Sequence, residues 1–346
     1  MSETEKAPAG GSPPNPNLWS RDGFTGTNAI ALRSDYTPTY TSVRGPHAPH
    51  RFNIFAIETE DQTSPDALPT PVLVGRNGLQ LSVSRRREST PFAMRNTEGD
   101  ELHFVQSGSV RFVTDFGTID AGPLDFVHIP RAITYRVEPL SDDLVALILT
   151  SPDALGFDTP APFGMINFGK AVRKPAIDPA LAEGPKRLLI RSFDGVTEFE
   201  MVHDPIRAMV QVGGKEPVWA LSLRDIVPVS YGTRGGPPAQ FLSTKDTGVM
   251  SFTLSARPGP RPPVHVNADY DEIILFAEGP GAWGKINEAG TITWVPKGVT
   301  HHGPKEDVPE GYQAWLIEVR QTMRLTAEAQ AQAHLIETSE YGRFGP

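Results

Sequence analysis

The sequence predicts an all-β protein that is built from two similar domains and contains few helices. Short runs in which apolar and polar residues alternate, such as residues 79–84 and 248–257, recur along the chain and are typical of half-buried strands. The chain contains 34 prolines and 32 glycines, a content that disfavours long helices and fits strands joined by many turns. Its length of 346 residues is typical of two domains.

The strand pattern is clearest in residues 100–150, which predict about five strands separated by turns. Strands at such regular spacing indicate a sandwich or barrel. The pattern fades in a Pro-rich stretch and then returns, so the second half is expected to repeat the first. The predicted division is a tail and arm over 1–44, a first barrel over 45–155, a connector over 156–195, a second barrel over 196–330 and a C-terminal tail over 331–346.

Two segments outside the predicted barrels have their own character. Residues 1–20 are polar and Pro-rich, and we expect them to be mobile. Residues 325–338 are rich in Ala, Glu and Gln, which favour helices, and Thr326 can cap the N-terminus of such a helix.

Composition excludes several classes of protein and of site. There is no cysteine, so disulfides, thiolate metal sites and cysteine nucleophiles are excluded. The 32 Lys and Arg against 41 Asp and Glu give a net charge of −9, which argues against a nucleic-acid partner. No apolar run is long enough for a membrane span, and the first residues lack the apolar core of a signal peptide. A cytoplasmic protein is therefore expected.

The strongest chemical signal is a pair of segments with metal-ligand residues. His265 and Asn267 are two positions apart, so on a strand their side chains face the same side, and Glu272 follows shortly after them. A second segment has a Pro-x-Gly turn followed by the adjacent His301 and His302. Two imidazoles and one carboxylate are the ligands that non-haem Fe(II) oxygenases use. The sequence therefore predicts an Fe(2+) site on His265, Glu272 and one of His301 and His302.

Two choices within this site stay open. Adjacent strand residues face opposite sides, so we expect only one of His301 and His302 to bind the metal directly. The other would support the site or carry a proton, because an imidazole titrates near neutral pH. Asn267 is either a weak oxygen ligand or a bystander.

The two segments resemble the two motifs of the cupin family. The family pattern is His-x-His, a Glu shortly after and a Gly six residues further on, and then a second segment of Gly, five residues, Pro-x-Gly, two residues and His. This chain matches nearly every spacing, through Gly279, Gly290, Pro296 and Gly298, and departs from the pattern at Asn267. The resemblance implies a bicupin, with two jelly-roll β-barrel domains.

The first domain is expected to lack a metal. Its equivalent stretch includes Glu101, His103 and His128, but no His-x-His precedes Glu101 and no histidine follows Pro130. We therefore interpret this domain as a non-metallated partner of the second.

Further segments, taken in order, resemble those of the homogentisate 1,2-dioxygenases. These segments are residues 95–119, 222–229, 261–272, 301–304 and 315–326. In that family the histidine of a His-Gly-Pro motif binds iron, which favours His302, whereas the Pro-x-Gly spacing favours His301. The chain is shorter than typical eukaryotic members, and its Glu lies one residue further from the first His. The large subunit of hydroquinone 1,2-dioxygenases resembles the same family and has an Asn near its iron, which suits Asn267.

The resemblance implies an Fe(II)-dependent enzyme of aromatic catabolism that inserts O₂ into a para-dihydroxylated ring, of the hydroquinone or homogentisate type. The expected partners are a small aromatic substrate, O₂ and either further copies of the chain or a small second subunit. Tyr270 could contact the ring, although a core role is the alternative. Competing hypotheses are another metal-dependent cupin enzyme, such as a gentisate-type dioxygenase, and a non-enzymatic ligand-binding bicupin.

Overall fold

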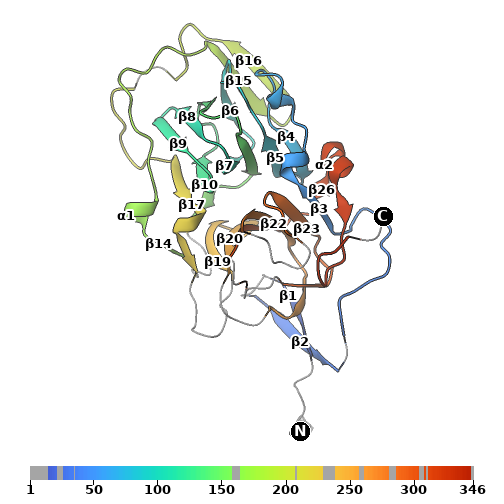
Figure 1. The fold of residues 1–346 in the computed structure, drawn as a ribbon. Coiled ribbons are helices and arrows are strands. Elements are labelled where there is room, and N and C mark those ends of the chain that lie inside the picture. Colours follow the sequence, from blue (N-terminus) through green and yellow to red (C-terminus); the bar gives the residue numbers. More distant parts are fainter. Residues whose placement is uncertain are drawn as a thin grey trace.

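The structure is a computed structural model of the chain, and it describes residues 15–21, 26–34, 36–157, 164–206, 209–228, 238–256, 261–279, 286–303, 308 and 311–343. Among these residues, no helix has both the length and the apolar character needed to cross a membrane. Figure 1 shows two β-rich units, one above the other.

The first unit is made of a seven-stranded and a six-stranded sheet. The larger sheet contains, in spatial order, β17 (Trp219–Ser222), β10 (Asp125–Ile129), β7 (Asp100–Ser107), β12 (Val145–Ser151), β5 (Gln80–Ser84), β4 (Thr70–Val74) and β26 (Arg324–Leu325). The smaller sheet contains β16 (Gly195–Glu200), β15 (Arg187–Ser192), β6 (Ala93–Asn96), β11 (Tyr135–Pro139), β8 (Val110–Thr114) and β9 (Gly117–Ala121).

The second unit is made of an eight-stranded and a four-stranded sheet. The larger sheet contains β13 (Leu155–Gly156), β19 (Ala239–Thr244), β20 (Val249–Ser255), β25 (Gln313–Val319), β22 (Asp271–Glu278), β23 (Thr291–Val295), β3 (His50–Asn53) and β27 (His334–Leu335). The smaller sheet contains β2 (Asn28–Arg33), β1 (Asn15–Ser20), β21 (Val264–Asn267) and β24 (His301–His302). A separate pair joins β14 (Gly164–Ile166) to β18 (Ile226–Pro228).

Helices are few and short. The α-helices are α1 (Phe168–Ala171) and α2 (Ala327–Gln332), and the 3₁₀ turns are η1 (Ile54–Ala56), η2 (Glu60–Gln62) and η3 (Leu223–Asp225). Thr326 caps α2 as predicted, since its Oγ1 accepts a hydrogen bond from the backbone N–H of Ala329. The helix is shorter than the predicted 325–338 because the chain becomes extended at Ala333 and then pairs with β3.

Alternation along the central strands divides the apolar side chains between separate cores on the two faces of each sheet. In β22, Ile273 and Leu275 face the large sheet of the first unit, and together the two sheets form one continuous core. Ile274 and Phe276 on the other face belong to the core of the second unit. The first unit has its own core around Phe112. The predicted fold class, an all-β bicupin with few helices, is confirmed.

The two units repeat each other in detail around one buried aspartate each. Asp100 begins β7 and Asp271 begins β22. The carboxylate of Asp100 accepts hydrogen bonds from Arg131 N (2.9 Å), Leu155 N (3.0 Å) and His128 Nε2 (3.2 Å). The carboxylate of Asp271 accepts them from Lys297 N (3.1 Å), Met323 N (2.9 Å) and Trp294 Nε1 (3.1 Å). The same three-way anchor therefore fixes the start of the central strand in both units.

Several strands pair across the predicted domain boundaries. β3 was predicted to lie in the first domain but pairs with β23 of the second unit. β15 lies in the predicted connector, and it runs parallel to β6 of the first unit. In the second unit β1 pairs with β21 in the equivalent parallel manner, so Asn15–Ser20, which lie in the predicted tail, form a strand of the sheet. Each unit is thus covered by a hairpin that comes from another part of the chain.

Candidate metal centre

Three strands of the second unit bring His265, Glu272 and His301 together. The pairing of β21 with β24 places His265 directly opposite His301, and Glu272 is the second residue of β22. One ligand atom from each of the three side chains lies within 4.8 Å of the other two. The residues are only 4%, 5% and 1% exposed, so the cluster lies inside the unit. Within the described part of the chain, no other group of His, Asp and Glu has this arrangement.

Backbone carbonyls orient both imidazoles. His265 Nδ1 lies 2.9 Å from Pro263 O, and His301 Nδ1 lies 3.0 Å from Val299 O. A carbonyl oxygen only accepts, so each Nδ1 carries a proton, and in the neutral ring Nε2 is the atom whose lone pair can bind a metal. His301 Nε2 lies 3.4 Å from Glu272 Oε2, a contact that favours a proton on Nε2 donated to the carboxylate. Hydrogen bonds of this kind commonly orient histidines that bind metals.

The charges inside the cluster are coupled. Burial and then the neighbouring His301 lower the pKa of His265 to about 4, which keeps this ring neutral at pH 7. Burial opposes the charged form of His301, but the Glu272 carboxylate outweighs it and raises the pKa of His301. Burial likewise raises the pKa of Glu272, but the two histidines and Asn267 together lower it below its usual value. The centre therefore offers one carboxylate and two imidazoles as ligands.

Asn267 also reaches this cluster. It is buried, and its Nδ2 lies 3.5 Å from Glu272 Oε2. As placed, the amide donates a long hydrogen bond to the carboxylate, so its position fits a residue that orients Glu272.

The structure separates the two adjacent histidines. His301 joins the cluster, whereas His302 points to the other side of β24 and is half-buried. Burial, followed by the nearby Arg261 guanidinium, lowers the pKa of His302. The backbone of His302 is held by Thr338 O and by the hydroxyl of Tyr341, which donates to His302 O at 2.7 Å.

The hydroxyl of Tyr270 contacts residues outside the cluster of His265, Glu272 and His301. The ring is fully buried in the core of the second unit. Its hydroxyl lies 3.0 Å from Thr247 Oγ1 and accepts a 2.5 Å hydrogen bond from Arg320. The guanidinium of Arg320 also lies over the ring, 5.1 Å from its centroid. These contacts fit a side chain that anchors the start of β22.

Sequence reasoning missed Glu318 as a component of the centre. It lies opposite Glu272 in the pairing of β25 with β22 and is 1% exposed. Among the described residues, neither of its carboxylate oxygens has a hydrogen-bond partner. Burial and then the Glu272 charge raise the pKa of Glu318 to about 8. A glutamate at an inward position of the apolar strand Gln313–Val319 was the available signal, because buried glutamates are rare without a partner.

The donors of the cluster fit a first-row divalent metal. The two Nε2 atoms and the Glu272 carboxylate form a set of two nitrogens and one oxygen, and both rings already have their Nδ1 protons bonded elsewhere. Such a set is typical of non-haem Fe(II) and leaves positions for substrate and O₂.

Known proteins similar to this chain include several that are named dioxygenases. A Saccharolobus solfataricus protein named "Putative dioxygenase" is 24% identical over 250 residues, which are 69% of this chain and 65% of that protein. The homogentisate 1,2-dioxygenase of Rhodopseudomonas palustris is 30% identical over 54% of this chain and 39% of its own length. That of Bradyrhizobium diazoefficiens is 26% identical over 68% of this chain and 58% of its own. The matches thus span between 39% and 65% of these relatives.

No protein-family model matches the chain. Among solved structures, a cupin barrel protein of Leptotrichia buccalis aligns with a TM-score of 0.44 at 12% identity, over 81% of this chain and all of that protein. A variant of Bacillus subtilis oxalate decarboxylase aligns with a TM-score of 0.42 at 13% identity, over 83% of this chain and 80% of that protein. The chain is thus similar in sequence, over part of its length, to proteins named homogentisate 1,2-dioxygenase.

Proposed function

We propose that the chain is an Fe(II)-dependent dioxygenase that opens a para-dihydroxylated aromatic ring of the hydroquinone or homogentisate type. The observation that carries the proposal is the buried cluster of His265, Glu272 and His301, whose ligand atoms lie within 4.8 Å of one another. The relatives named homogentisate 1,2-dioxygenase support the reaction class.

His265, Glu272 and His301 would hold the iron. Bound there, Fe(II) would supply a Lewis acid that favours the ionised phenol and a redox centre for O₂. The residues of the chain would orient the metal ligands and exclude water. Pro263 O and Val299 O fix the two imidazoles, and Asn267 steadies the Glu272 carboxylate. Water is limited because the cluster is almost fully buried.

His302 and Tyr270 remain candidate catalytic residues of this proposal, in unequal positions. His302 is the stronger candidate because it follows His301 directly in β24 and is half-buried, although its side chain lies on the other side of that strand from the cluster. Tyr270 is a weaker candidate, because its hydroxyl is held by Arg320 and Thr247.

Two arginines that could bind an acidic substituent of the ring are already paired within the described part of the chain. Homogentisate carries an acetate that calls for a cationic or hydrogen-bonding partner. Arg224, Arg234 and Arg261 are candidates for that partner, and of these Arg234 lies outside the described residues. Arg224 already pairs with Glu278 at 2.5 Å, and Arg261 pairs with Glu340 at 2.9 Å and with two backbone carbonyls. Hydroquinone needs no such partner, so among the two substrates the proposal leans toward hydroquinone.

The test is anaerobic reconstitution with Fe(II), followed by O₂ uptake with hydroquinone, homogentisate and gentisate. Uptake with a new ultraviolet absorbance is expected for a para-dihydroxylated ring. Glu272→Ala should abolish both bound iron and O₂ uptake, whereas Glu278→Ala, on the exposed end of the same strand, should keep both. Retention of iron and full activity by Glu272→Ala would contradict the site. Stoichiometric binding of a ligand without O₂ uptake would favour a non-enzymatic bicupin.

We propose that the protein acts in the cytoplasm, either as a homo-oligomer or with a small second subunit. Size-exclusion chromatography with light scattering, applied to protein purified from its native host, distinguishes these assemblies. A single species of one chain mass would contradict both.

A further inference from the structure

The first unit has a cavity at the place where the second unit has its candidate metal centre. The cavity has a volume of about 510 Å³, and Glu101 and Tyr135 line it. Strand pairing makes the two places equivalent. Tyr135 lies opposite Met94 in the pair of β11 with β6, as His301 lies opposite His265 in the pair of β24 with β21.

The donors in the first unit suit an organic molecule better than a metal ion. Met94 and Tyr135 occupy the positions of the two histidines, and Glu101 occupies the position of Glu272. The Glu101 carboxylate accepts a 2.5 Å hydrogen bond from the Tyr135 hydroxyl and a 2.8 Å hydrogen bond from Asn96. Its oxygens are thus engaged by protein donors, and the space above them is left for a ligand.

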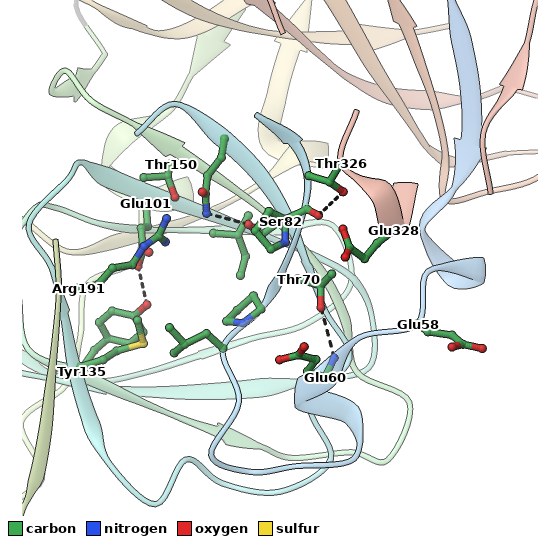
Figure 2. Close-up of a pocket in the computed structure, with 16 residues that line it drawn as sticks. Glu58, Glu60, Thr70, Ser82, Glu101, Tyr135, Thr150, Arg191, Thr326 and Glu328 are labelled. Atoms are coloured by element: carbon green, nitrogen blue, oxygen red, sulfur yellow. Dashed lines mark hydrogen bonds between the residues drawn. The ribbon is translucent and has the colours of Figure 1, made fainter. Parts of the chain in front are cut away.

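Charge is unevenly distributed around the cavity. Figure 2 shows Glu101, Tyr135 and Arg191 on one side, and Glu60 and Glu328 on the opposite side. Arg191 is the one cationic side chain among the described residues that line the cavity, and it shares its side with the Glu101 carboxylate. Glu58 also lines the side of Glu60 and Glu328, and all three of these glutamates are exposed. The charged side chains on that side are therefore all carboxylates, and such a concentration of one sign of charge attracts ligands of the other sign.

The remaining lining adds an apolar surface and hydroxyl groups. Leu68, Met94 and Ile148 supply the apolar surface, and Thr70 and Ser82 supply hydroxyls. Apolar walls with a few convergent polar groups, within a volume of this order, are typical of sites for small organic molecules.

We propose that this cavity binds a small organic cation, an amine whose ammonium faces Glu60 and Glu328 and whose apolar body lies against Leu68, Met94 and Ile148. The first unit is then a ligand-binding partner of the second, and the inference does not depend on the proposed dioxygenase activity.

Isothermal titration calorimetry of the full chain tests the proposal with two probes of matched shape. Phenethylamine carries an ammonium, and phenylacetate carries a carboxylate on a similar body. One saturable site is expected for phenethylamine, with phenylacetate about tenfold weaker or more. Glu60→Gln and Glu328→Gln should each weaken phenethylamine binding about three- to tenfold, because each removes one charge and preserves the shape. Glu88→Gln, an exposed glutamate that does not line the cavity, should leave binding unchanged.

A variant of the second unit locates the site. Glu272→Ala should bind phenethylamine as tightly as the unchanged chain, and loss of binding in this variant would move the ligand to the second unit and overturn the proposal. Equal affinity for both probes, or no saturable binding of phenethylamine, would also overturn it. The calorimetric measurement does not involve O₂ uptake, so a negative result would overturn the amine site without bearing on the proposed dioxygenase function.

Discussion

The proton positions on the two imidazoles decide what the candidate centre can bind. Both Nδ1 atoms are held by carbonyls that lie two residues earlier in the chain, at Pro263 and Val299. This local geometry directs both Nε2 atoms inward before any ion arrives. Metal affinity then gains from preorganisation, since little side-chain freedom is left to lose on binding.

Variants of the adjacent histidines should separate their roles. His301→Ala removes a member of the cluster and should abolish stoichiometric Fe(II) or Co(II) binding, whereas His302→Ala should bind metal normally. Metal analysis of the dialysed proteins, supported by the rise in Tm that bound metal produces, gives the measurement. The reverse pattern would show that the second histidine is the ligand and that β24 turns over when metal binds.

Glu101 predicts a pH dependence in the first unit. Burial raises its pKa, but the neighbouring His103 imidazole, 3.4 Å away, and the hydrogen bonds from Tyr135 and Asn96 lower it below the usual value. The folded protein therefore binds fewer protons here than the unfolded chain, and the stabilisation is present above about pH 4.5 and is lost as pH falls through the folded pKa. Glu101→Gln should lower the free energy of unfolding by about 1–3 kcal/mol at pH 7, and by less near pH 4. Denaturant titrations at both pH values measure this, and a cost that is constant with pH would contradict it.

At the scale of elements, hairpins that come from distant parts of the chain complete both units. β15 runs parallel to β6, and β1 runs parallel to β21, with Arg191 opposite Asn96 and Ser20 opposite Asn267. In each unit the added strand therefore reaches the position next to the candidate site. Gly298 in the second unit and Ala132 in the first both adopt a left-handed conformation, at φ 81° and φ 63°, so the turn before the site is also repeated.

The cap of α2 is a second point where an element is anchored. Thr326 Oγ1 accepts from Ala329 N at 3.4 Å and donates to Pro71 O at 2.8 Å, which ties the helix to β4. Thr326→Ala should cost about 1 kcal/mol of the free energy of unfolding, the usual value of a lost N-cap. Thr326→Ser keeps the oxygen and serves as the control, since it should cost clearly less. Equal losses would mean that the methyl group, and not the hydrogen bonds, is what matters.

At the scale of the whole molecule, the two units share one core. Phe104 and Phe126 of the first unit pack on Trp315 of the second, with ring centroids 5.6 and 5.0 Å from that of Trp315. Trp294, Trp315 and Phe241 belong to the same core, so large buried aromatic side chains lie between the two large sheets and each unit shields the other from water there.

This shared core predicts that the units unfold together. Trp315→Ala should lower the free energy of unfolding by about 3–5 kcal/mol and should destabilise both units, because it opens a cavity between them. Phe193→Ala, at a side chain that is 89% exposed, is the control and should change little. Calorimetry of Trp315→Ala should show a single unfolding transition whose Tm is lower than that of the unchanged chain. Two separate transitions, of which only one moves, would contradict a common core.

Much of this protein follows from local patterns in the sequence. Alternation in residues 79–84 and 248–257 predicted β5 and β20 near their observed bounds, because the side chains of a strand alternate between its two faces along consecutive residues. The spacing of His265, Glu272 and the two histidines predicted a cluster for the same reason. Thr326 was recognised as a cap from its position before a run of helix-forming residues.

The pairing of strands that are distant in the sequence could be seen only in the tertiary structure. Nothing local shows that β3 joins β23 or that β1 lies beside β21, since the registers depend on surfaces that exist only after folding. His301 and His302 are adjacent, so their side chains point to opposite faces of β24. The pairing of β24 with β21 decides which of the two faces the cluster. Glu318 lies 46 residues after Glu272, and although its place in an apolar strand marks it as inward-facing, only the pairing of β25 with β22 shows that it meets Glu272.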